Sequence, residues 1–74
     1  MIVTSVVIDI QPGMSGAVLS SLALMEKASV YGFKDDKIIV VLESATSDEL
    51  EKLAAALHAM EFVTGVNPVF SANA

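Results

Sequence analysis

Residues 37–43 read Lys37-Ile38-Ile39-Val40-Val41-Leu42-Glu43, a run of five large apolar residues between two charged ones. Most of the five are β-branched, which favours a strand. A strand with one solvated face would alternate apolar and polar residues, and a buried helix would be longer. The run therefore predicts a central strand that needs cover on both faces.

The composition limits the class of protein. A chain of 74 residues has room for one domain, expected over residues 1–74. Its apolar runs reach about five residues, far short of the roughly 20 that span a bilayer, so no membrane span is expected. Residues 1–5 lack the basic region of a secretory signal, which predicts a cytoplasmic protein. The absence of cysteine excludes disulfides and thiolate metal sites.

The charge balance bears on the partner. The net charge is −5, with four lysines and no arginine. An acidic chain is repelled by phosphate backbones and anionic lipid, so nucleic acid and membrane surfaces are not expected partners. A charged partner, if there is one, should be basic.

Apolar spacing and turn residues divide the chain into six elements. Strands are expected at about residues 2–10, 28–33, 37–43 and 66–70, and helices at about 12–27 and 46–60. The second helix opens with a capping box from Thr46 to Glu49. Asp35-Asp36 predicts a tight turn, so the strands on either side of it should form a hairpin.

The order of these elements predicts an α+β fold. Right-handed crossovers in a βαββαβ chain give a ferredoxin-like sandwich with an antiparallel sheet of order 4-1-3-2 and two helices on one face. The fourth strand then lies at an edge, as Pro68 requires because its nitrogen cannot donate to a neighbouring strand. Two helices cannot cover both faces of the sheet.

The uncovered face is expected to be apolar. Its predicted members are Val7, Tyr31, Phe33, Ile39 and Val41, joined by Val66, Pro68 and Phe70 or by the alternate Val69. A contiguous apolar patch of this kind marks an interaction site. The residues alone leave three occupants open: a second copy in a homodimer, a different protein or peptide, or a small ligand.

No catalytic constellation is evident. His58 is the only histidine and lies beside the apolar stripe of its helix, where a solvated position is expected. Without arginine there is no phosphate clamp of the acylphosphatase kind. An RNA-binding sheet would need aromatic residues on its central strands and a basic surface. We therefore expect no enzyme, no metal site and no cofactor.

Segments along nearly the whole chain resemble the NapD family. They are Ser5-Val6-Val7-Ile8, Pro12, Val18-Leu19-Ser20-Ser21-Leu22, Val30-Tyr31-Gly32, residues 37–43, and Val63-Thr64-Gly65-Val66-Asn67-Pro68-Val69-Phe70. The resemblance lies in their order and spacing.

The resemblance implies a cytoplasmic chaperone. Such a protein binds the twin-arginine signal peptide of the periplasmic nitrate reductase catalytic subunit, and holds it back from export while the molybdenum cofactor is inserted. The apolar contacts would come from the five residues predicted on the uncovered face. The charge partners of the arginines would be Asp9, Asp35, Asp36 or Glu43.

Two other functions remain open from the sequence. Asp9-Ile10-Gln11-Pro12-Gly13-Met14 also resembles the strand-to-helix turn of ACT domains, which share this topology and bind amino acids near that turn. A homodimeric interaction domain without a ligand is the other alternative.

Overall fold

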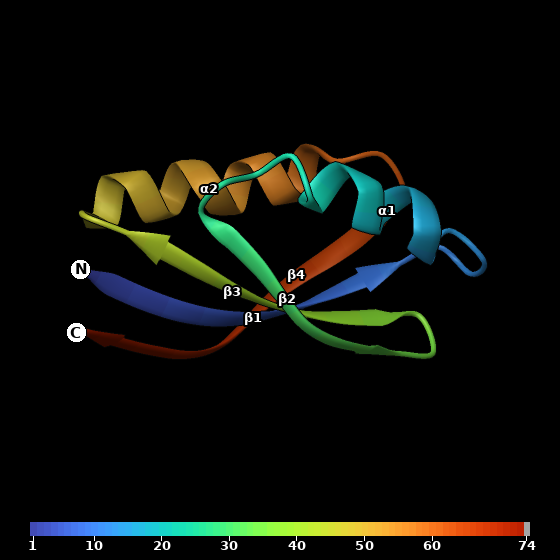
Figure 1. The fold of residues 1–74 in the computed structure, drawn as a ribbon, viewed down its shortest axis with the longest axis horizontal. Coiled ribbons are helices and arrows are strands. Elements are labelled where there is room, and N and C mark those ends of the chain that lie inside the picture. The colour runs from blue at the N-terminus through green and yellow to red at the C-terminus, as the bar shows by residue number, and fades with distance from the viewer. Residues whose placement is uncertain (74) are drawn as a thin grey trace.

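A computed structural model describes residues 1–73 of the chain. The elements are β1 (Ile2–Ile10), α1 (Ser15–Leu22), β2 (Ala28–Lys34), β3 (Lys37–Ser44), α2 (Ser47–Ala59) and β4 (Val63–Asn73). The four strands form one sheet of order β2-β3-β1-β4, and every pairing is antiparallel. Both helices lie against the same face of this sheet (Figure 1). The predicted ferredoxin-like α+β fold is confirmed.

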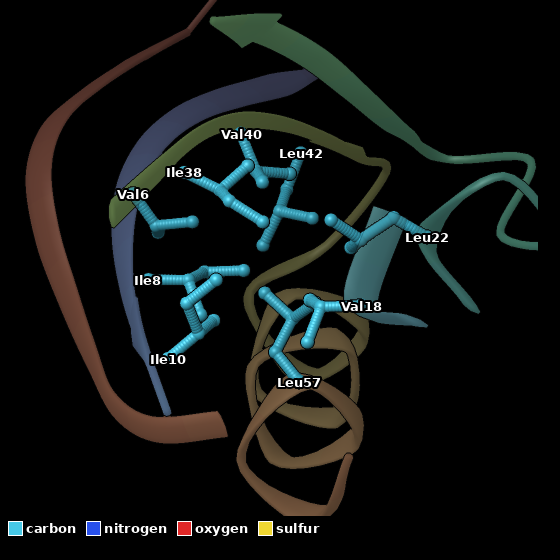
Figure 2. Close-up of a cluster of buried hydrophobic side chains, with 9 residues drawn as sticks. All are labelled: Val6, Ile8, Ile10, Val18, Leu22, Ile38, Val40, Leu42 and Leu57. Carbon is cyan, nitrogen blue, oxygen red and sulfur yellow. The ribbon is translucent and has the colours of Figure 1, made fainter. Parts of the chain in front are cut away.

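One core lies between the sheet and the helices. Its buried residues are Val6, Ile8, Ile10, Val18, Leu22, Ile38, Val40, Leu42 and Leu57. Alternate residues of β1 and β3 point toward side chains from α1 and α2 (Figure 2). The helices therefore cover one face of the central strand β3. The apolar run of β3 predicted cover on both faces, and no element of residues 1–73 covers the second one (Figure 1).

Helix α1 is shorter than predicted. It begins at Ser15, because Gln11-Pro12-Gly13 forms a separate turn in which Gly13 has a φ of 80°. Only glycine adopts this conformation without strain. Beyond Leu22 the chain turns toward the edge strand β2, and the amide of Met25 donates to the carbonyl of Leu22. Met25 still packs against the core, but from this turn.

Helix α2 begins where its capping box predicted. The Thr46 hydroxyl accepts a hydrogen bond of 3.1 Å from the amide of Glu49. The Glu49 carboxylate lies 2.6 Å from the Lys27 ammonium, which joins the turn before β2 to the first turn of α2. This bond lowers the pKa of Glu49 and raises the pKa of Lys27. The bond therefore weakens as the pH falls through the lowered pKa of Glu49 and the carboxylate takes up a proton.

The pH dependence of this ion pair can be measured. Because the folded pKa of Glu49 lies below its ordinary value, its stabilising effect is present at neutral pH and is lost as the pH falls through the folded pKa. We expect Glu49→Gln to lower the free energy of unfolding at about pH 7 and to match the wild type at an acidic pH below the folded pKa of Glu49.

Urea unfolding at both pH values would check this, with Glu51→Gln as the matched control. Glu51 is on the same helix and forms no ion pair with the rest of residues 1–73. A difference between wild type and Glu49→Gln that stays constant between the two pH values would contradict the assignment.

Strand β4 is longer than predicted and lies at a sheet edge. It pairs with β1 from Val63 opposite Ile10 to Asn73 opposite Ile2, so the length of β1 sets the length of β4. Pro68 is accommodated because β4 has no neighbour on its other side. Over residues 1–73, no helix is both long enough and apolar enough to span a membrane.

Candidate functional site

The sheet face away from the helices has no covering element in residues 1–73 (Figure 1). We call it the open face. Its central members are Val7 on β1, which pairs with Ile39 on β3, and Ser5 on β1, which pairs with Val41 on β3. The Ile39 side chain is 46% exposed, whereas Ile38 beside it is fully buried. The open face is thus apolar at its centre and accessible.

A bulge in β4 decides which of its residues join the open face. Val66 and Pro68 pair with Ile8 and Val6, which face the helices. Val69 is then an extra residue, and Phe70 pairs with Ser5 on the open face. The sequence predicted either Val66, Pro68 and Phe70 or the alternate Val69 for this face. The register places Phe70 on it, whereas Val66 and Pro68 pair with residues that face the helices.

A bulge in β2 similarly changes the alternation expected there. The two-residue turn pairs Lys34 with Lys37, and the register then places Gly32 opposite Ile39. Tyr31 is the extra residue at the bulge and is 73% exposed. Phe33 pairs with the core residue Ile38, yet its ring is 62% exposed. Glycine therefore occupies the open-face position of β2 beside Ile39, and the prediction that Phe33 has an open-face position is wrong, because the register set by the turn pairs it with a core residue.

A hollow of about 460 Å³ lies over Gly32 at the hairpin end of the open face. It is lined by Val7, Gly32, Phe33, Lys34, Asp35, Lys37 and Ile39. Three of the five expected apolar residues meet there, namely Val7, Phe33 and Ile39. Tyr31 and Val41 lie outside the lining. Gly32 was not expected from the sequence, although the two-residue turn at Asp35-Asp36 was the signal that could have placed it.

The carboxylate of Asp9 is already engaged. One oxygen accepts a 2.5 Å bond from the Lys37 ammonium, and the other accepts a 3.0 Å bond from the Asn67 amide nitrogen. The Lys37 bond lowers the pKa of Asp9. A Cβ atom on the neighbouring Gly65 would lie only 3.1 Å from the Asp9 carboxylate, so glycine permits this close approach.

The other three predicted charge partners lie at the two ends of the open face. Asp35 and Asp36 form the tip of the hairpin, and the Asp36 carbonyl accepts a 3.0 Å bond from the amide of Ile10. Glu43 pairs with Val3 at the opposite end. All three side chains are exposed, and none forms an ion pair within residues 1–73. They are available to a basic partner.

His58 is exposed on α2, and residues 1–73 contain no cluster of side chains arranged to hold a metal ion. The fold and the open face define a small ferredoxin-like sandwich with one bare apolar sheet face.

The family model described as NapD protein matches residues 1–73, and the chain belongs to the NapD family. This is a chaperone family with a role in nitrate reductase maturation. No curated protein and no solved structure showed significant similarity to the chain.

Proposed function

We propose that the open face binds the twin-arginine signal peptide of a periplasmic nitrate reductase precursor in the cytoplasm. Binding holds the precursor back from export while its cofactor is inserted. The observation that carries the proposal is the bare apolar face, with Ile39 46% exposed at its centre, in a chain of the NapD family.

The dimensions of the open face suit a helical peptide. Four strands about 4.8 Å apart make a sheet roughly 14 Å wide between its outer strands. An α-helix with its side chains is about 10 to 12 Å across, so a single helix would cover most of that width. The apolar segment of the signal peptide would then cover β1 and β3 on the side that α1 and α2 leave bare.

The charges of the open face suit the arginine pair. The chain carries a net charge of −5 and has no arginine of its own. Asp35 and Asp36 at one end and Glu43 at the other are exposed, and either end can receive a guanidinium. Asp9 is the weaker candidate, because a guest arginine would have to displace Lys37 from it. Such exposed charges steer association and are screened by salt.

The proposal is tested by removing the two aromatic side chains of β2. We expect Tyr31→Ala combined with Phe33→Ala to weaken binding of a reductase signal peptide by about 10-fold or more, measured by calorimetry. Both side chains are more than 60% exposed, so their truncation leaves no cavity and the domain should remain folded.

The matched control is Leu24→Ala, which removes an 86% exposed apolar side chain from the turn after α1. It should bind like the wild type. An unchanged affinity in the double variant would remove the β2 aromatic residues from the site. A wild-type protein that takes up no signal peptide would refute the proposed function itself.

A further inference from the structure

We infer that the hollow over Gly32 is a socket for one large apolar side chain of the bound peptide, and that Gly32 thereby determines which peptides bind. This inference rests on the proposed function and specifies one contact within it. The socket consists of the Gly32 backbone with Val7, Ile39 and Phe33 around it.

The register of the sheet builds the socket. One row of paired residues crosses the four strands as Asn67, Val7, Ile39 and Gly32. The row carries side chains until it reaches β2, where the register set by the two-residue turn places a glycine opposite Ile39. The surface of the sheet is therefore lower at Gly32, next to Ile39, which is the most exposed apolar residue of the central strands.

Neither backbone strain nor crowding requires glycine here. Gly13 is the glycine with a positive φ, and Gly32 is not in that conformation. A Cβ atom at Gly32 would meet no atom within 4 Å. Because glycine weakens a strand relative to β-branched residues, a side chain at this position would be expected to help the fold. What the glycine provides is open space on the face of the sheet.

The occupant is an apolar side chain of the signal peptide. A polar side chain would lose its water against Val7 and Ile39 without gaining a hydrogen-bond partner. The charged residues of the lining are Lys34, Asp35 and Lys37 at its hairpin end. Lys37 is bound by Asp9, and neither Lys34 nor Asp35 forms an ion pair within residues 1–73. A cationic residue next to the anchoring side chain would reach Asp35. A second copy fits poorly, because it brings another net charge of −5 to the same surface.

Filling the socket tests the inference. We expect Gly32→Val to weaken binding of the signal peptide by about 10-fold or more in calorimetry, with an unfolding temperature equal to or above that of the wild type. Gly32→Ala, which adds only a methyl group, should give a smaller loss. The matched control is Ser29→Val, which adds the same side chain to the same strand opposite Val41, outside the socket lining.

An alanine scan of the peptide completes the experiment. With the wild-type protein, alanine at one large apolar position of the peptide should weaken binding more than alanine at any other position. With Gly32→Val, the same change in the peptide should cause little further loss of affinity, because the two changes remove the same contact. Additive losses, or equal weakening by Ser29→Val, would overturn the socket and leave the proposed function standing.

Two other outcomes separate the hypotheses further. A wild-type protein without affinity for the peptide would refute the proposed function. If free amino acids instead raise the unfolding temperature of the wild type but not of Gly32→Val, the hollow is a small-ligand site and the inference is overturned.

Discussion

The Ile39→Lys variant should stay folded and bind the signal peptide about 10- to 100-fold more weakly than the wild type. Ile39 is 46% exposed in the free protein, so an ammonium at this position remains hydrated until a guest arrives. Binding would then have to strip water from that charge, give up the apolar contact of the isoleucine, and bring the new cation near the guest arginines.

The control for this variant must separate the position from the charge. Ala55→Lys makes the same change in net charge on α2 at a residue that is also exposed, and on the opposite side of the sheet. Calorimetry on both variants should show a loss for Ile39→Lys that greatly exceeds the loss for Ala55→Lys. Similar losses would mean that only the overall charge matters, and the open face would then have no special role.

The second large effect concerns the neighbouring residue. Ile38→Ala should lower the free energy of unfolding by about 2 to 5 kcal/mol, because Ile38 is fully buried and its truncation leaves a cavity under α1 and α2. A domain of 74 residues has a total stability of roughly 4 to 11 kcal/mol. The variant should therefore lose a substantial part of the stability of the domain.

Urea unfolding of Ile38→Ala beside Ile39→Ala measures this contrast with the same chemical change at adjacent positions. Ile39→Ala should cost less than about 1 kcal/mol, since nearly half of its side chain is already in water. Equal costs at the two positions would show that both faces of β3 are covered in solution, and a homodimer over the open face would become the explanation.

These two variants compare the helix-facing side of β3 with its open-face side. Ile38, Val40 and Leu42 hold the fold together and are not available to a partner. The residues between them on β3, Ile39 and Val41, are not fully buried and are expected to contribute less to folding. A guest that covers them binds the folded state alone, and so should raise the unfolding temperature of the domain.

Much of the fold followed from local patterns. The apolar run at residues 37–43 identified the central strand, Pro68 identified the edge strand, and the capping box at Thr46 identified the start of α2. Each of these signals depends on a few neighbouring residues, because helix and strand periods and capping bonds are local. The helix after Pro12 was predicted too long, since its end depends on where the chain must turn to enter β2.

The sequence by itself determined the order of the elements, the topology and the apolar character of both faces of β3. Only the tertiary structure decided that Tyr31 is the extra residue of a bulge, that Phe70 joins the open face, and that Lys37 and Asn67 hold Asp9. The physical reason is that bulges and cross-strand bonds arise where separate segments pair. Their register is set by the whole sheet, and no single segment carries it.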